Sequence, residues 1–426
     1  MHTSRSQAEA YTVVVGAGQA GLATSYFLQR LGIAHVVLER GRVGESWRSQ
    51  RWDSFVLNTP NALNGLPGAP YEGPLPDGFW HRDELVQSFE RYARRFALPI
   101  RAGVEVEGVA GRRGDGFVVH ARTGTAAEEI RAETVVIASG AMRTPQRPPF
   151  ATGLPEHIAQ LDAASYRNPG ALPSGPVLVV GSGQSGCQIA EELQAAGRTV
   201  YLSTSRVGRI PRHYRGRDVD AWLWESGFFD VRRSELADPS LVLATQPQVS
   251  GVGRHGHTLS LQQLAADGVR LLGRAIGIAG TGMILDDRLR DHIAFADRAS
   301  AEIKRTIDDY IAQSGIAAPP PEDDPADRPW ADLADVTAPG RLDLARAWIG
   351  TVIWCTGFGA DFSWLRLPVL DERGRPLHER GVSPVPGLYF VGLPWLYKRK
   401  SGIICGVEED AAHIARLIAA RPALAA

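Results

Sequence analysis

Two glycine-rich stretches, GAGQAG at 16–21 and GSGQSG at 181–186, have a spacing that suits the binding of phosphate groups. Each follows an apolar run that predicts a strand and precedes a segment with the apolar spacing of a helix. The first glycine allows a tight turn, the second lets the backbone approach a pyrophosphate, and the third lets helix pack on strand. The start of the helix adds free N–H groups. The sequence therefore predicts two dinucleotide sites, with Gly16, Gly18, Gln19 and Gly21 in the first and Gly181, Gly183, Gln184, Ser185 and Gly186 in the second.

The residues that end the next strand distinguish the two predicted sites. Glu39, followed by Arg40, lies 18 residues after the last glycine of the first loop, where a carboxylate accepts hydrogen bonds from ribose hydroxyls. The same count from the second loop reaches Thr204, and Arg206 follows shortly after. No carboxylate would repel a 2′-phosphate there, and an arginine can pair with one, so we predict NADP rather than NAD. The alternative is that Arg206 is a solvated surface residue.

The elements around these loops predict an α/β protein. Residues 11–39 and 176–206 each have the pattern of strand, glycine turn, helix and strand. The strand-like runs TVVIASG at 134–140 and TVIWCTG at 351–357 follow the two units, and each ends at a small residue and a glycine, as a strand does beneath a cofactor. We therefore expect two Rossmann-like dinucleotide-binding domains, the second inserted in the first.

Two dinucleotide sites in one chain are most simply explained by a bound FAD that takes hydride from a transient NADPH. The first loop would then belong to an FAD-binding domain and the second to an NADPH-binding domain. The predicted boundaries are 1–165 and 346–426 for the FAD domain and 166–345 for the NADPH domain, with an elaboration at about 210–345. Within that elaboration, 283–314 has the pattern of a long helix, and the proline-rich, acidic segment 317–329 predicts an exposed loop.

Composition narrows the range of partners. The chain has 46 basic and 47 acidic residues among 426, so no overall positive field would attract nucleic acid or an anionic membrane. No apolar run approaches the ~20 residues of a membrane span, and the N-terminal stretch does not resemble a signal peptide, so we expect a cytoplasmic protein. The three cysteines, Cys187, Cys355 and Cys405, are too scattered for a CxxC pair or a zinc site, and no metal is expected.

Several motifs together resemble the class B flavoprotein monooxygenases, which include the flavin-containing and Baeyer-Villiger monooxygenases. These motifs are YTVVVGAGQAGLATSYFLQRLG, ERGRVGESWRSQRWDSF, VLVVGSGQSGCQIAEEL, VIWCTGF and GLYFVGLPW. The resemblance implies that NADPH reduces FAD, that O2 adds to the reduced flavin at C4a, and that NADP+ stays bound. It implies a small organic substrate oxygenated at nitrogen, at sulfur or by Baeyer-Villiger insertion, with the flavin carrying the chemistry. Residues 210–345 match the family poorly.

The same resemblance implies roles for single residues. The segment Gly44 to Trp47 would lie beside FAD, with Arg48 reaching toward the flavin or NADP. Asn58 falls where the family often has an asparagine near the flavin. The alternatives are that Trp47 is ordinary core and that Asn58 belongs to a turn. Further cofactor-binding residues implied by the matching motifs are Thr356, Gly357 and Gly392.

The stretch EHIAQLDAASYR at 156–167 lies where the family has a histidine followed four residues later by an aromatic. Counting back four from Tyr166 reaches Asp162, whereas His157 has a leucine at the corresponding place. We therefore expect Asp162 in the histidine's place and His157 to be exposed. An aspartate keeps an acceptor but loses the imidazole's donor, so the coupling of NADPH oxidation to oxygenation is the property most open to change. The alternatives are an NADPH-dependent flavin reductase or oxidase without coupled oxygenation, and a flavin-binding sensor.

Overall fold

The computed structural model describes residues 7–111, 116–329 and 339–421. Its larger sheet has eight strands, in the order β19-β4-β5-β6-β1-β2-β3, with β20 pairing the C-terminal end of β6. β1, β2, β3, β6 and β20 are parallel neighbours, while β5 is antiparallel to both β4 and β6. The bounds of these strands are β1 Gln7–Val15, β2 His35–Glu39, β3 Ile100–Ala102, β4 Val104–Gly111, β5 Phe117–Thr123, β6 Ala126–Ile137, β19 Leu365–Arg366 and β20 Leu388–Phe390.

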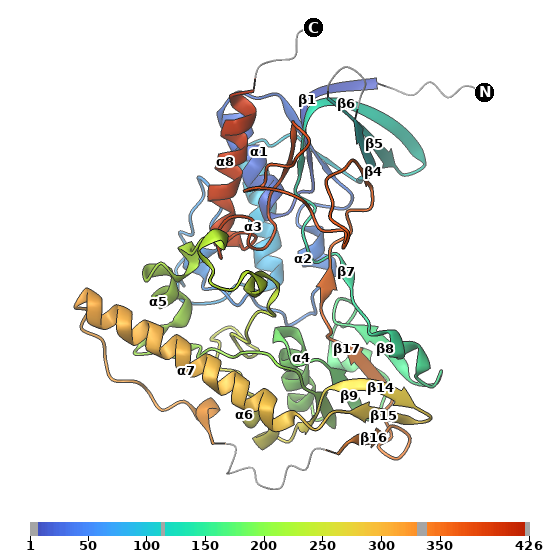
Figure 1. The fold of residues 1–426 in the computed structure, drawn as a ribbon, viewed down its shortest axis with the longest axis vertical. Helices are drawn as coiled ribbons and strands as arrows, with labels where there is room; N and C mark the ends of the chain where they lie inside the picture. Colours follow the sequence, from blue (N-terminus) through green and yellow to red (C-terminus); the bar gives the residue numbers. More distant parts are fainter. Residues whose placement is uncertain (1–6, 112–115, 330–338, 422–426) are drawn as a thin grey trace.

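Alternation along the central strand divides the core around this sheet into two layers. Val14 packs among helix residues on one face, while Val13 and Val15 pack with the β4–β5 hairpin on the other. The helices of the first layer are α1 (Gln19–Arg30), α3 (Arg82–Arg95) and α8 (Val407–Ala419), which stand together in the upper part of Figure 1. The predicted strand–turn–helix–strand unit at 11–39 is therefore present, and α1 begins directly after the second glycine of the loop.

The smaller sheet repeats this plan with five parallel strands in the order β13-β10-β9-β17-β8. Helices α4 (Gln184–Ala195) and α6 (Leu261–Ala266) lie on one face, and a three-stranded antiparallel sheet, β14-β15-β16, packs on the other. The bounds are β8 Ala159–Asp162, β9 Val177–Val180, β10 Val200–Ser203, β13 Arg270–Leu272, β14 Ala275–Ala279, β15 Gly282–Leu285, β16 Arg341–Asp343 and β17 Thr351–Trp354.

A short antiparallel ribbon joins the two sheets. β7 (Thr144–Pro145) leaves the larger sheet after β6 and pairs with β18 (Phe358–Gly359), which follows β17 of the smaller sheet. Figure 1 shows β7 between the two halves of the molecule. The pairing of β17 with β9 and of β8 with β17 places 159–162 and 351–354 in the smaller sheet, so the boundaries expected at 165/166 and 345/346 cut through it. The reason is that both strands lie outside the 176–206 unit from which the boundaries were judged.

The elaboration differs in one respect from its predicted structure. The long helix α7 runs over Leu289–Ser314, but the first part of the predicted helix, 282–285, is strand β15. Its apolar side chains pack against the smaller sheet, and the acidic turn at 286–287 separates the strand from the helix. Segment 317–329 is a largely exposed loop, as predicted, with one turn of 3-10 helix at Pro325–Asp327. Other short helices in this part are α5 (Val219–Glu225) and the turns at Phe228–Asp230 and Pro239–Leu243.

The packing of α1 gives a matched test of the core. Leu28 is fully buried, whereas Leu31, one turn later, is 46% exposed. Leu28→Ala should destabilise the protein by about 2–5 kcal/mol, because it leaves a cavity between α1 and the sheet. Leu31→Ala should change stability by less than about 0.5 kcal/mol. Calorimetric melting of both variants beside the unmodified chain measures this difference, and equal shifts would contradict the packing described.

Candidate functional site

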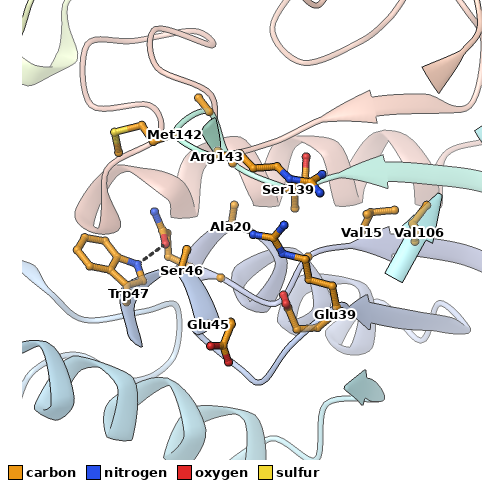
Figure 2. Close-up of a pocket in the computed structure, with 18 of the residues that line it drawn as sticks. Val15, Ala20, Glu39, Glu45, Ser46, Trp47, Val106, Ser139, Met142 and Arg143 are labelled. Carbon is orange, nitrogen blue, oxygen red and sulfur yellow. Dashed lines mark hydrogen bonds between the residues drawn. The ribbon is translucent and has the colours of Figure 1, made fainter. Parts of the chain in front are cut away.

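A long pocket lies across the C-terminal ends of the parallel strands of the larger sheet. Its lining comes from β1, the first glycine loop, β2, α2 (Glu45–Ser49), β4 and the segments that follow β6 and β20. In Figure 2, Val15, Val106 and Glu39 lie toward one end, and Trp47 and Met142 lie at the other. The sequence-predicted residues that line it are Gly16, Gly18, Gln19, Glu39, Arg40, Trp47 and Gly392.

The glycines of the first loop have three separate spatial roles. Gly16 has φ +107°, and a Cβ there would lie 2.6 Å from the carbonyl oxygen of Ala138. A Cβ on Gly21 would lie 1.8 Å from the carbonyl oxygen of Gly16, so the helix passes too close to the loop for any side chain. A Cβ on Gly18 would meet nothing within 4 Å. The open space beside Gly18, at the N-terminus of α1, is where a pyrophosphate can approach the backbone.

The carboxylate of Glu39 is fixed at the end of β2. It is 8% exposed, and its two oxygens accept hydrogen bonds from the backbone N–H of Ala17 at 2.8 Å and of Gly41 at 2.9 Å. These two bonds hold the acid beside the glycine loop while leaving it on the pocket wall. A carboxylate oxygen has a second lone pair, so it can still accept from a ribose hydroxyl.

The GESW segment forms the wall near the other end of the pocket. Gly44 has φ +70° and starts α2, and Trp47 follows within its first turns. The Trp47 indole N–H donates to Oε1 of Gln19 at 3.1 Å, and the Gln19 amide donates to the carbonyl of Gly402 at 3.3 Å. These bonds join α1, α2 and the segment after β20. Trp47 therefore lies partly buried beside the pocket, where it also packs against the hydrophobic core.

Arg48, which the resemblance placed toward the flavin or NADP, points away from this pocket. Its guanidinium donates to Oε1 of Glu90 on α3 at 2.7 Å, and Arg48 is not among the lining residues. Arg51, three residues later, lines the pocket instead, together with Arg40 and Arg143. On a short helix, residues three apart lie on the same side, but α2 ends at Ser49, so the two side chains diverge.

Other lining residues escaped the sequence analysis. Glu105 lies on β4, and Ser139, Met142 and Arg143 follow β6. The run TVVIASG at 134–140 was noted as a strand end beneath a cofactor, and this signal could have extended the site to Ser139. Nothing in the local sequence around Glu105 marks it, because β4 reaches the pocket only through its pairing across the sheet.

The second glycine loop repeats the geometry of the first. Gly181 has φ +105°, and a Cβ there would lie 2.4 Å from the carbonyl oxygen of Cys355. A Cβ on Gly186 would lie 1.8 Å from the carbonyl oxygen of Gly181, and one on Gly183 would meet nothing within 4 Å. Space for a phosphate therefore lies beside Gly183 at the N-terminus of α4, as it does beside Gly18. Ser185 follows in the first turn of that helix.

Around the second loop, the side chains of Gln184 and Thr204 make hydrogen bonds within the protein, whereas that of Arg206 is exposed. Gln184 holds the segment 249–250, since its amide donates to the Ser250 carbonyl at 2.6 Å and accepts from the Val249 N–H at 2.6 Å. Thr204 is 1% exposed, and its hydroxyl donates to the Leu272 carbonyl at 2.7 Å. This contact explains the threonine as a link between β10 and β13 rather than as a ribose ligand. Arg206 is exposed, and its guanidinium lies 4.3 Å from the ring centre of Phe295 on α7.

Thr356 and Gly357 lie in the connection between the sheets. The Thr356 hydroxyl donates to the carbonyl of Gln146, and the Gln146 N–H donates to the Gly357 carbonyl at 2.9 Å. Gly357 has φ +99°, and a Cβ there would meet nothing within 4 Å. The two residues thus correspond in position to Ser139 and Gly140, which line the first pocket after β6.

Asn58 lies where the two halves of the molecule meet. Its side-chain oxygen accepts a hydrogen bond from Gln188 on α4 at 3.4 Å, and its carbonyl accepts one from Arg212 at 2.6 Å. Arg212 is fully buried and pairs with Asp218 and, at 3.4 Å, with Asp220. Burial raises the pKa of Asp220 to about 6, with Arg212 opposing the shift. Asn58 is not among the residues lining the pocket of the first loop.

The run 208–218 is rich in arginine, which would suit either an extension of phosphate binding or a solvated loop. The structure supports neither for the run as a whole, because its arginines pair with carboxylates of the protein. The pairs are Arg209 with Asp297 and Asp327, Arg212 with Asp218 and Asp220, Arg215 with Asp308, and Arg217 with Glu225. The run therefore fixes α5 and α7 to the smaller sheet.

Asp162 ends β8 and pairs with Arg147. The Arg147 guanidinium donates to both carboxylate oxygens, at 2.7 and 2.8 Å, and Asp162 raises the pKa of Arg147. Arg147 belongs to the segment that enters the smaller sheet directly after β7. Asp162 thus lies at the crossing between the sheets, where its position in the sequence placed it, and His157 is exposed as expected.

Two other classes of site were sought in the part of the chain that the structure describes. Within it, no cluster of three or more His, Cys, Asp or Glu side chains is arranged to hold a metal ion. None of the helices in the same residues combines the length and apolar character needed to cross a bilayer. Burial raises the pKa of the thiols of Cys355 and Cys405 to about 12, and that of Cys187 further.

Comparison with known proteins finds relatives that match either about half of the chain or nearly all of it. The family described as pyridine nucleotide-disulphide oxidoreductase matches residues 13–224. An uncharacterized CzcO-like oxidoreductase from Geobacillus kaustophilus is 33% identical over 406 residues, which are 94% of this chain and 96% of the relative. An indole-3-pyruvate monooxygenase, YUCCA4 of Oryza sativa subsp. japonica, is 30% identical over 224 residues, 48% of this chain and 49% of that protein.

Among solved structures, a flavin-containing monooxygenase from Stenotrophomonas maltophilia has the same fold. Its TM-score is 0.62 at 21% identity, and the match covers 97% of this chain and 99% of that one. The sequence prediction of a class B flavoprotein monooxygenase-like protein is thus confirmed at the level of family and fold. The near full-length match to the Geobacillus relative carries the assignment: the chain belongs to the CzcO-like oxidoreductases.

Proposed function

We propose that the protein is an NADPH- and O2-dependent FAD monooxygenase that oxygenates a small organic substrate, at nitrogen, at sulfur or by Baeyer-Villiger insertion. The observation that carries the proposal is the repetition of one loop geometry in two sheets. In each loop a Cβ on the middle glycine would meet nothing within 4 Å, at the N-terminus of a helix. Two such sites in one chain suit a resident flavin and a second nucleotide that reduces it.

The pocket of the larger sheet fits FAD. Glu39 can hold the ribose of the adenosine half, the N-terminus of α1 can hold the pyrophosphate, and Trp47 and Gly392 line the way beyond. A bound flavin would accept hydride from NADPH and, once reduced, activate O2. The chain's part is to bind and orient the cofactor and to keep water from it.

The smaller sheet fits NADPH. The space beside Gly183 at the start of α4 suits the pyrophosphate, and Arg206 lies exposed beyond the end of β10, where the 2′-phosphate would reach. Asn58 contacts Gln188 on α4, so it lies between the helix of this loop and the larger sheet. This place supports a role for Asn58 near the nicotinamide, and Asp162, at the crossing, supports a role in coupling the two cofactors.

A second candidate, a reductase or oxidase that releases peroxide, is favoured by one observation. Both carboxylate oxygens of Asp162 accept hydrogen bonds from Arg147, so the residue expected in the histidine's place offers an acceptor and no N–H donor. A disulfide reductase is disfavoured, because the thiols have raised pKa values and the nucleophilic thiolate would be scarce at neutral pH.

The central experiment measures NADPH oxidation, oxygenated product and hydrogen peroxide together in air. A coupled monooxygenase should form one product molecule for each NADPH in the presence of its substrate, with little peroxide. A panel of amines, thioethers and ketones covers the three oxygenation types. If every NADPH oxidised yields peroxide across the panel, the reductase or oxidase alternative replaces the proposal.

The second loop allows a test with an internal control. Gly183→Ala should change the free energy of unfolding by less than about 0.5 kcal/mol, because φ of −70° suits alanine and its Cβ would meet no atom within 4 Å. Its KM for NADPH should rise about tenfold or more, because the methyl group occupies the approach of the pyrophosphate. Gly186→Ala should instead fail to fold stably, since its Cβ would lie 1.8 Å from the Gly181 carbonyl oxygen. An unchanged KM for NADPH in Gly183→Ala would show that the pyrophosphate does not bind at this loop. As a control, the FAD content of Gly183→Ala should equal that of the unmodified protein, because the variant leaves the first loop unchanged.

Arg206 tests the choice of nucleotide. Arg206→Ala should raise the KM for NADPH about tenfold or more while leaving that for NADH nearly unchanged, because only NADPH carries the 2′-phosphate. Arg305→Ala removes an exposed arginine elsewhere on the smaller half, from α7, and should change neither. Steady-state kinetics with both nucleotides measures the effect. Parallel losses for NADH and NADPH would show that Arg206 does not read the 2′-phosphate.

A further inference from the structure

Arg51 is a cation of the pocket wall with an unusual setting. It follows α2, and its guanidinium lies 5.1 Å from the ring centre of Trp47 and 5.5 Å from that of Phe55. Among the described residues, the one hydrogen bond of this guanidinium runs from Nη1 to the carbonyl of Gln50, at 2.9 Å. The two aromatic rings hold the side chain in place while the pocket remains open to it. The arrangement fixes a positive charge on the wall.

No carboxylate in the described part of the chain pairs with this charge. Burial lowers the pKa of Arg51 to about 10, with no acidic neighbour acting against it, so the group remains protonated at neutral pH. The acids of the same pocket have other partners. Glu39 accepts from backbone N–H groups, Glu45 pairs with Arg42, and Glu105 pairs with Arg122.

The remaining lining arginines do not share this setting. Arg143 has Glu105 within 3.7 Å, and Arg40 is exposed to solvent. A partly buried cation without a counter-ion is costly, and the cost falls when an anion enters the site. Arg51 therefore marks the part of the pocket that an anionic group of the ligand should face.

The position along the pocket identifies that group. Glu39 marks the ribose end, and the glycine loop with the start of α1 marks the pyrophosphate. Trp47 lies beyond them, toward the end of the pocket that also has Met142 (Figure 2), and Arg51 packs on Trp47. A dinucleotide laid along this path brings its flavin ring, not its pyrophosphate, to Arg51.

We propose that Arg51 faces the isoalloxazine ring of FAD and provides the positive charge that stabilises the ring after reduction. A flavin that takes up two electrons and one proton gains one negative charge, and a nearby fixed cation favours that form electrostatically. Arg51 is then a positioning residue that sets the ease with which NADPH reduces the flavin. The inference rests on the FAD site of the proposed function but not on oxygenation.

The test uses the FAD-loaded protein and does not depend on turnover. The midpoint potential of the bound flavin is measured anaerobically against a reference dye, and the dissociation constant of oxidised FAD by its fluorescence. In Arg51→Gln the reduced flavin should lose about tenfold more affinity than the oxidised flavin, which lowers the potential by about 30 mV. Arg51→Lys, which keeps the charge, should retain most of the potential. Arg94→Gln, which removes an exposed arginine from α3, should match the unmodified protein.

The outcomes separate this inference from the proposed function. Equal losses of oxidised and reduced FAD in Arg51→Gln, with an unchanged potential, would place the arginine on the pyrophosphate and overturn the inference alone. A purified protein that binds no FAD would overturn the proposed function as well. Should the glutamine variant not accumulate, Arg51→Met keeps the stem that packs on Trp47 and Phe55 and gives the same comparison.

Discussion

The two sites depend on the close approach of the last glycine of each loop to the first glycine of the same loop. A Cβ on Gly21 or Gly186 would lie 1.8 Å from the carbonyl oxygen of Gly16 or Gly181. This contact draws the N-termini of α1 and α4 onto the ends of β1 and β9, so that the free N–H groups point over the edge of each sheet. The neighbouring strand ends, at Ala138 and Cys355, approach the first glycine from the other side. Each site is therefore built where three backbone segments meet, before any side chain contributes.

A small set of contacts joins the two halves of the molecule that carry these sites. The ribbon of β7 and β18 carries the chain between the sheets, and Arg147 fastens its exit to Asp162 at the end of β8. On the other side, Asn58 joins α4 through Gln188 and the elaboration through Arg212. Burial of Arg212 together with two acids is costly in isolation, so this contact is better explained as fixing one arrangement of the segments than as adding stability.

The sequence predicted the backbone of the sites better than their side chains. Strand β2, the two glycine turns and helices α1 and α4 follow from local periodicity and from glycine chemistry, which act over a few residues. Arg51 could not be told from Arg48, because the end of α2 after Ser49 decides which arginine reaches the pocket. Thr204 was placed correctly at the end of β10, but its partner Leu272 lies 68 residues away. The same holds for β17, which joins the smaller sheet by pairing with β9, and for β8, which joins it by pairing with β17.

Charge pairing determines which arginines near the two glycine loops remain available to a ligand. In the elaboration, the arginines of 208–218 are paired with carboxylates of the protein, which largely compensate their charges. Arg206 and Arg51 lie outside these pairs, one exposed beyond the second loop and one on the wall of the first pocket. Because each is held by an aromatic ring rather than by an acid, its direction is fixed while its charge stays available. A 2′-phosphate and a reduced flavin are the two negative charges that the proposed reaction would bring to these places.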